Sequence, residues 1–366
     1  MALIKTLSVA MIGTEHANAS GVMCELRQYE NDIYYPGSSK LFNVVCYVDN
    51  NPTTKEHFEN LKYLAYEEFD QTWQTLGLDA LIIETEMDDL LTVADKYLEM
   101  CGLPIHMDKP TGYDEKFIDL MKKAESKDVP VSLGYMYRFN PAVIETRKIL
   151  REDADNRGKK LPEQIGKVFQ INCNMNFDGG DNTRKDMEKY PGGGLYVYGS
   201  HMLDLVYYFL GPPSDIHVIK KSVDILVSNG CDNGLVVLEY ANGTGIININ
   251  LAAGNGYNQR SIVLYGDQGC IEIHPMEVGE ENGADPSDIM QISTRYGADP
   301  KKAQADYKTS ENVDLSSYHF DRRYLYMMKN FAYLVNKDTK NILFDCDYEY
   351  EKSLHELLLK IIKEEK

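Results

Sequence analysis

The first third of the chain alternates continuous apolar runs with amphipathic segments. The apolar runs predict buried strands and read LSVAMIG, NVVCYVD, LDALIIET, LPIHMDKP and VPVSLGY. Between the later runs, apolar residues recur at helical spacing over residues 88–101, which Gly102 terminates, and again from Asp114 onward. Continuous apolar strands separated by amphipathic helices predict a parallel sheet covered by helices on both faces.

After residue 138 the pattern changes to strands that follow one another. The runs KVFQINCNMNF, GLVVLEYA, GIININLAA, RSIVLYG and CIEIHP predict a mainly antiparallel sheet, and ANGTG between two of them is a hairpin signal. In GIININL, Ile247, Ile249 and Leu251 alternate with Asn248 and Asn250. One face of this sheet is therefore expected in the core and the other toward solvent or a partner.

The two patterns predict two domains, which also suits a length of 366 residues. We expect an α/β domain with a parallel sheet over residues 1–137. An α+β domain with a large, mostly antiparallel sheet is expected over residues 138–366. The last helix should cover the segment YEYEKSLHELLLKIIKEE.

Charge and cysteine content narrow the class of protein. The formal net charge of −19 argues against a nucleic-acid or anionic-membrane partner. The first residues predict a strand rather than a signal peptide, and no apolar stretch has the length of a membrane span. The seven cysteines are scattered without a CxxC pair, which favours free thiols in a reducing cytoplasm and predicts no metal site.

The stretch GLPIHMDKPTG suggests a site residue. Pro110 cannot donate to a strand ladder and holds the residue before it extended. Lys109 is therefore expected at the end of a buried strand, fixed by a stiff turn.

The first strand leads into IGTEHANASG, where a dinucleotide-binding loop would carry three glycines. Gly13 is present, but Glu15 and Asn18 occupy the second and third positions, so a plain strand–turn–helix is nearly as good an interpretation. Asp49 ends the second strand, where a carboxylate would bind the ribose hydroxyls of NAD. An ordinary strand-end turn, DNNP, is the alternative.

A second candidate segment is YPGGGLYVYGSHMLDLVYYFLG. Its three consecutive glycines cannot serve a helix interior, so they predict a turn or a close backbone approach. A helix carrying His201 follows. A lone histidine at a helix start is more often structural than catalytic, and the glycine-rich approach together with Lys109 makes a catalytic role worth considering.

Four motifs in order, DKPTG, GYMYRFNP, GGGLYVYGSHMLD and IVLYGDQGCIEI, resemble the Gfo/Idh/MocA oxidoreductases over nearly the whole chain. The resemblance implies an N-terminal Rossmann domain, a C-terminal domain on a large antiparallel sheet and a bound nicotinamide cofactor. It implies oxidation of a secondary hydroxyl on a sugar, polyol or related small molecule. It also implies a homodimer or homotetramer.

The resemblance carries roles onto individual residues. Lys109 matches the lysine of the family's Glu-Lys-Pro motif, with Asp108 in place of the glutamate, and His201 matches the catalytic histidine. The cofactor, NAD rather than NADP, is expected at Gly13, Asp49, Thr85, Lys109 and Pro110. The substrate is expected at Arg138, Tyr198 and Asp204.

Val197 departs from the family, which usually has an aspartate four residues before the histidine. Tyr196, Tyr198 or Asp204 are the candidates to replace it. Together with Glu15 and Asn18, this departure leaves two other classes open. One is a nucleotide-binding or regulatory protein without turnover. The other is an NAD-assisted glycoside hydrolase of the same superfamily.

Overall fold

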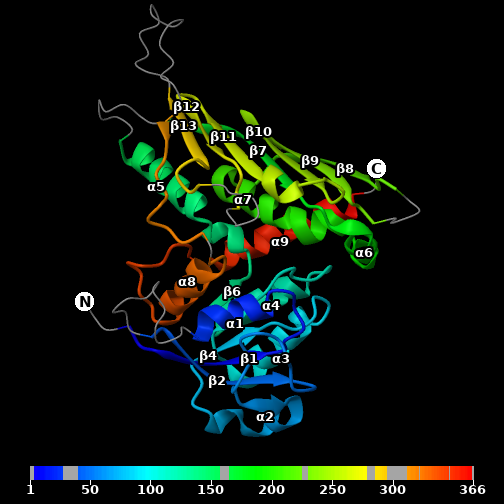
Figure 1. Cartoon of the computed structure of the whole chain (residues 1–366), viewed down its shortest axis with the longest axis vertical. Helices are drawn as coiled ribbons and strands as arrows, with labels where there is room; N and C mark the ends of the chain where they lie inside the picture. The colour runs from blue at the N-terminus through cyan, green and yellow to red at the C-terminus, as the bar shows by residue number, and fades with distance from the viewer. Residues whose placement is uncertain are drawn as a thin grey trace, which may run out of the picture. The chain divides into compact units, whose positions relative to one another are not determined.

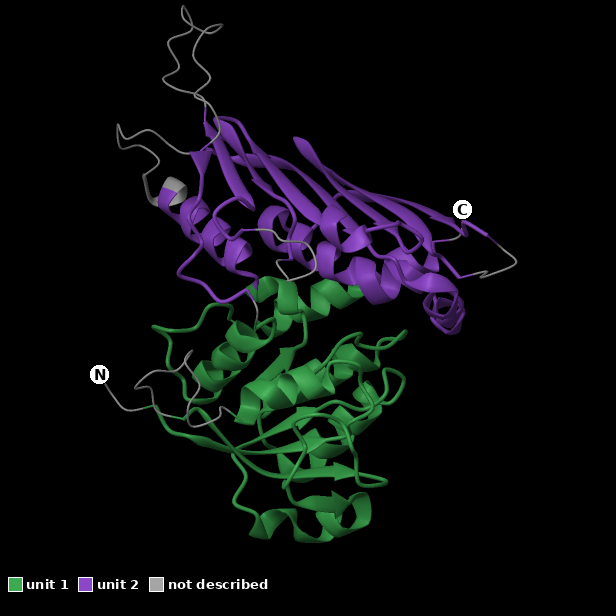
Figure 2. Cartoon of the chain, viewed as in Figure 1, with its two compact units in different colours: residues 1–139, 322–356 green, residues 140–321, 357–366 purple. Residues whose placement is uncertain are grey.

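The computed structural model divides the chain into two compact units (Figure 2). The first comprises Met1–Phe139 and Arg322–Glu356, and the second comprises Asn140–Asp321 and Leu357–Lys366. The residues that the structure describes are 4–27, 40–156, 165–224, 230–277, 285–294, 311–320, 322–345 and 347–364.

The first unit is built on a six-stranded parallel sheet in the order β3-β2-β1-β4-β5-β6. This is the Rossmann strand order, so the predicted fold of the N-terminal domain is confirmed. The strands are β1 (Leu7–Ile12), β2 (Phe42–Asp49), β3 (Tyr63–Ala65), β4 (Ala80–Ile83), β5 (Ile105–Met107) and β6 (Val131–Leu133). The helices among them are α1 (Ala19–Arg27), α2 (Tyr66–Thr72), α3 (Leu90–Cys101) and α4 (Lys116–Ser126) (Figure 1).

The helices of this unit form where the apolar spacing predicts them. On α4 the predicted apolar stripe is buried, and α3 ends at Gly102, which is left-handed with φ of 60°. A glycine adopts that conformation without a Cβ penalty, which is why it terminates the helix.

Residues 322–356 pack with the first unit, although the sequence pattern assigned them to the C-terminal domain. They carry α8 (Leu325–Val335) and most of the turns of α9 (Tyr348–Lys363). The Arg322 guanidinium donates two hydrogen bonds to the Glu25 carboxylate of α1, at 2.8 and 2.5 Å. No local sequence pattern indicates such a long-range pairing.

The second unit carries an eight-stranded sheet in the order β14-β13-β12-β11-β7-β10-β9-β8. Every neighbouring pair is antiparallel except β10 with β7, so the predicted mostly antiparallel sheet is confirmed. Its strands are β7 (Val168–Asn176), β8 (Asp215–Lys221), β9 (Asn233–Tyr240), β10 (Gly243–Asn250), β11 (Ser261–Gly266), β12 (Gly269–Ile273), β13 (Met290–Thr294) and β14 (Glu311–Asn312).

The two faces of this sheet differ as the alternation on β10 predicts. Ile247, Ile249 and Leu251 are buried, while Asn248 and Asn250 are half-buried. In Figure 1 the helices α5 (Pro141–Asn156) and α7 (Ser200–Leu210) lie on one side of the sheet, together with the short α6 (Gly180–Asp186). Among the described residues, no helix has the length and apolar composition to cross a membrane.

Candidate functional site

Gly13 begins the loop between β1 and α1, and it contacts the chain that follows β4. Its φ is 78°, and a Cβ at this position would overlap the Thr85 side chain and lie 2.7 Å from Thr85 Cα. Gly13 is therefore required both for its backbone conformation and for the close approach of two strand ends. In an open α/β sheet, ligands bind outside the carboxyl ends of the strands, which is where Gly13 and Thr85 lie.

Asp49 is the last residue of β2, and its side chain is directed to the β1 loop. Its Oδ2 accepts a hydrogen bond from Thr14 Oγ1 at 2.5 Å, and its Oδ1 accepts one from the Asn50 amide at 2.6 Å. The carboxylate is buried at the place where the ribose hydroxyls of a dinucleotide are bound in this fold.

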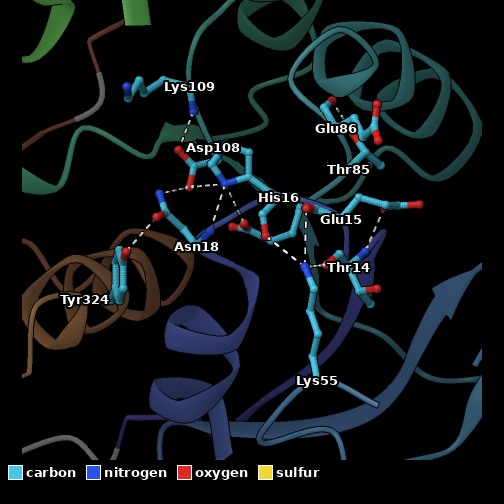
Figure 3. Close-up of polar contacts among 11 residues, drawn as sticks. Thr14, Glu15, His16, Asn18, Lys55, Thr85, Glu86, Asp108, Lys109 and Tyr324 are labelled. Atoms are coloured by element: carbon cyan, nitrogen blue, oxygen red, sulfur yellow. Dashed lines mark hydrogen bonds and ion pairs between the residues drawn. The ribbon is translucent and has the colours of Figure 1, made fainter. Parts of the chain in front are cut away.

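The loop itself presents both favourable and competing groups to a pyrophosphate. Lys55 Nζ donates to the Thr14 carbonyl oxygen and lies 3.3 Å from the carbonyl oxygens of Glu15 and His16 (Figure 3). The Thr14 amide donates to Glu15 Oε2 at 3.0 Å. Because Glu15 is exposed, its side chain can turn away and release this donor. The residues present therefore fit a dinucleotide, with Glu15 as the competing anion.

Lys109 follows β5 in a turn that the neighbouring side chains hold. Its amide donates to Asp108 Oδ1 at 2.7 Å, and Asn18 Nδ2 donates to Asp108 Oδ2 at 2.8 Å. The Tyr324 hydroxyl donates to Asn18 Oδ1 at 2.7 Å (Figure 3). The peptide bond from Lys109 to Pro110 is cis, and Lys109 is buried. Asn18, which breaks the glycine fingerprint, thus connects the β1 loop to the turn that carries Lys109.

His16, Glu84 and Asp108 form a buried cluster beneath this turn. His16 Nδ1 lies 3.2 Å from Asp108 Oδ2 and 3.5 Å from Glu84 Oε2. Burial lowers the pKa of His16, and the nearby Asp108 opposes that shift. Burial, reinforced by the charge of Asp108, raises the pKa of Glu84 well above its usual range.

Arg138, expected at the substrate, is instead part of a buried ion pair. Its Nη1 and Nη2 donate to the two carboxylate oxygens of Glu351 at 2.5 and 2.9 Å, and both side chains are at most 2% exposed. The guanidinium carbon lies 4.6 Å from the ring centre of Tyr135 and 4.4 Å from that of Phe344. This arrangement supports a structural role, so Arg138 is not carried into the proposed function.

Gly193 and Gly194, in the glycine-rich segment before His201, lie close to the backbone of Cys231. Gly192 and Gly193 have φ of 78° and 51°, and a Cβ on Gly193 would lie 2.6 Å from the Cys231 nitrogen. The Gly194 amide donates to the Cys231 carbonyl oxygen at 2.6 Å. Of the two predicted alternatives, the close backbone approach is confirmed, and the neighbouring backbone is that of Cys231.

A π-helical turn, Leu195–Gly199, leads directly into α7 and His201. Val197 lies in this turn and is buried, as are His201 and Asp204. Tyr198 stacks on Phe177 with ring centres 5.3 Å apart, and burial raises its pKa. Inserted π turns recur at functional sites, and no simple residue pattern predicts this one.

The structure thus brings Gly13, Thr85 and Asp49 to one edge of the first sheet, and the network through Asn18 joins the turn of Lys109 and Pro110 to the same loop. His201, Tyr198 and Asp204 lie in the second unit.

The sequence interpretation missed Lys55 and the buried pair of His16 and Glu84. Glu84 had a detectable signal, a charged residue directly after the apolar run LII.

Comparisons of the sequence with known proteins found two partial matches. Residues 162–272 match the GFO/IDH/MocA C-terminal domain model. A putative UDP-kanosamine synthase oxidoreductase subunit from Amycolatopsis mediterranei is 24% identical over 197 residues, which are 52% of this chain and 50% of that protein. The matched part of the chain thus spans about half the length of this relative.

Solved structures match along nearly the whole chain. A putative NADPH-dependent oxidoreductase from Desulfitobacterium hafniense superposes with a TM-score of 0.73 at 16% identity, covering 98% of this chain and 95% of that one. UDP-N-acetylglucosamine 3-dehydrogenase from Acidithiobacillus ferrooxidans gives 0.69 at 14% identity, covering 98% and 97%. The family model thus supports the resemblance to this family over residues 162–272, and the superpositions show the predicted fold along nearly the whole chain.

Proposed function

We propose that the protein is a nicotinamide-dependent dehydrogenase that acts on a secondary hydroxyl of a sugar-like small molecule. The observation that carries this proposal is Lys109, a buried lysine in the turn after β5, at the carboxyl edge of a Rossmann sheet. The family domain and the sugar-related names of the relatives support the substrate class. The bound nicotinamide would supply the hydride acceptor.

The residues of the chain have separate tasks in this reaction. Gly13, Thr85 and the β1 loop hold the dinucleotide, and Asp49 binds its ribose hydroxyls. The Lys109 ammonium stabilises the alkoxide that develops at the reacting hydroxyl, an effect that is strong where water is excluded. His201 takes the hydroxyl proton, for which an imidazole is suited near neutral pH.

NAD is the proposed cofactor. A 2′-phosphate would lie against the Asp49 carboxylate, which hydrogen bonds from Thr14 and Asn50 hold in place. The matched Desulfitobacterium protein is named as NADPH-dependent, so members of this fold differ in this preference.

We also propose that the protein forms homodimers or homotetramers through the open face of the eight-stranded sheet. Ile219 on β8 pairs with Leu235, which pairs with Asn248, so it lies on this face. Its side chain is 49% exposed, and a partner subunit would cover it. Sedimentation at micromolar concentration tests this, and a monomer would contradict it.

Incubation of the purified protein with NAD or NADP and a panel of sugars, polyols and nucleotide sugars tests the proposed reaction. Net formation of the reduced cofactor is expected with at least one substrate. Cleavage of aryl glycosides without net cofactor reduction would instead show a hydrolase. Nucleotide binding without turnover of any panel member would show a binding or regulatory protein.

A further inference from the structure

Glu84 is a buried carboxylate that the proposed reaction does not use. Its side chain is fully buried, and neither oxygen has a hydrogen-bond partner among the residues that the structure describes. A buried polar group without a hydrogen-bond partner is destabilising whether it is charged or neutral, so it requires an explanation. Glu84 extends into the cluster with His16 and Asp108, which is where that explanation must lie.

The three side chains direct one ligand atom each to a common point. The donor atoms of His16, Glu84 and Asp108 all lie within 4.8 Å of one another, and Nδ1 is 3.5 and 3.2 Å from the two carboxylate oxygens. Ligands about 2.1 Å from a tetrahedral zinc ion are separated from one another by about 3.4 Å. The two separations from His16 Nδ1 match that value.

The hydrogen bonds around the cluster leave acceptors facing one another. The Asn18 amide donates to His16 Nδ1 at 3.2 Å, so this nitrogen carries no proton, and an ion would replace the Asn18 amide on its lone pair. Nδ1 and the nearest carboxylate oxygens are therefore acceptors at close range.

Two lysines act on the cluster electrostatically, and neither occupies its centre. Lys55 Nζ binds the Thr14 carbonyl oxygen, with those of Glu15 and His16 at 3.3 Å. Figure 3 shows the Lys109 side chain extending away from the Asp108 carboxylate. Two carboxylates and an unprotonated ring nitrogen therefore lie close together, an arrangement that a small cation would stabilise.

We propose that His16, Glu84 and Asp108 bind one divalent transition-metal ion of the zinc type, with a fourth position left for water. This site was not expected from the sequence, which suggested no metal because its cysteines are scattered. The ligands come from the β1 loop, the end of β4 and the end of β5. The ion would join these three strand ends and hold the turn that carries Lys109.

A second group of three candidate ligands provides a matched control. Asp215, His217 and Glu239 also place their ligand atoms within 4.8 Å, but all three are exposed. His217 Nε2 already lies 2.8 Å from Glu239 Oε1, a cross-strand pair on β8 and β9 that needs no ion. We expect this group to contribute no tightly held metal.

Metal content tests the proposal without reference to turnover. The chelator-treated protein is incubated with zinc alone, freed of excess ion, and analysed for bound metal and for thermal unfolding. About one equivalent is expected in the wild type and in His217→Gln, and less than one tenth of an equivalent in Glu84→Gln, whose uncharged side chain keeps the shape of the site. Cobalt should give the visible bands of a four-coordinate site in the first two proteins only.

Several results would overturn the proposal. They are a wild type without bound zinc, a Glu84→Gln variant that keeps a full equivalent, or equal loss of metal in His217→Gln. If Glu84→Gln does not fold by circular dichroism, His16→Gln replaces it in the same comparison. A dehydrogenase without metal would contradict this proposal alone, whereas a metal-binding protein without turnover would contradict only the proposed function.

Discussion

Two groups of buried charge in the first unit differ in how they are balanced. Arg138 and Glu351 satisfy each other through two hydrogen bonds, and aromatic rings surround the guanidinium. The side-chain oxygens of Glu84 have no hydrogen-bond partner among the described residues, and the His16 imidazole lies between them and the Asp108 carboxylate. Burial alone therefore does not distinguish a structural charge from a functional one. The two cases differ in whether the protein's own side chains supply the hydrogen-bond and ion-pair partners of the buried charge.

Breaking the complete pair should have the largest effect on stability. Arg138→Met leaves the Glu351 carboxylate buried without its partner, which costs about 3–5 kcal/mol in the free energy of unfolding. Urea denaturation measures this loss. The double variant Arg138→Met/Glu351→Leu should recover most of it, because two apolar side chains replace both charges. A single variant within about 1 kcal/mol of the wild type would mean that the pair is not the balanced unit described.

Lys109 should affect turnover rather than folding. Lys109→Ala is expected to lower kcat by at least about 10²–10³-fold, the usual cost of removing one group that stabilises a developing oxyanion. Lys116→Ala is the control, because its side chain is 79% exposed on α4. Unchanged activity on a confirmed substrate would remove Lys109 from the mechanism, and an unfolded variant would assign it a structural role.

Asp49 should determine the choice between NAD and NADP. Like charges about 4 Å apart repel by about 1–4 kcal/mol, so NAD should bind at least about fivefold more tightly. Asp49→Asn should reduce this preference, and Glu56→Gln, with a side chain 81% exposed, should preserve it. Titration of both nucleotides by calorimetry measures the ratio. Equal or tighter NADP binding by the wild type would contradict the assignment to the ribose.

Three features could be predicted from the sequence: both sheets, the end of a helix at Gly102, and the close approach at the glycines before His201. Each depends on local spacing or on conformations that only glycine favours. The positions of Arg138 and of residues 322–356 could not be predicted from the sequence. Arg138 pairs with a residue more than 200 positions away, and a motif reports only that an arginine is present. The cluster of His16, Glu84 and Asp108 was missed for the same reason, because three strand ends bring its members together.

Val197 tests the reverse case, a buried position where the family usually has a charge and this chain has none. The residue is buried in the π turn before His201, so Val197→Asp would place a carboxylate near the start of the helix that carries the proposed base. A nearby negative charge favours the protonated imidazole and raises its pKa. The rise in kcat/KM with pH depends on the neutral base, so it should move to higher pH, by about one unit, the usual spread of such shifts in folded proteins.

The pH dependence of kcat/KM for the wild type, Val197→Asp and Val197→Asn decides this. The asparagine variant has the shape of aspartate without its charge, so it should keep the wild-type profile if the effect is electrostatic. In other general-base systems an orienting carboxylate is worth on the order of 10⁴ in rate, so activity itself should also rise in the aspartate variant if nothing else orients His201. Unaltered profiles in both variants would mean that His201 is not the base, or that residue 197 is directed away from it.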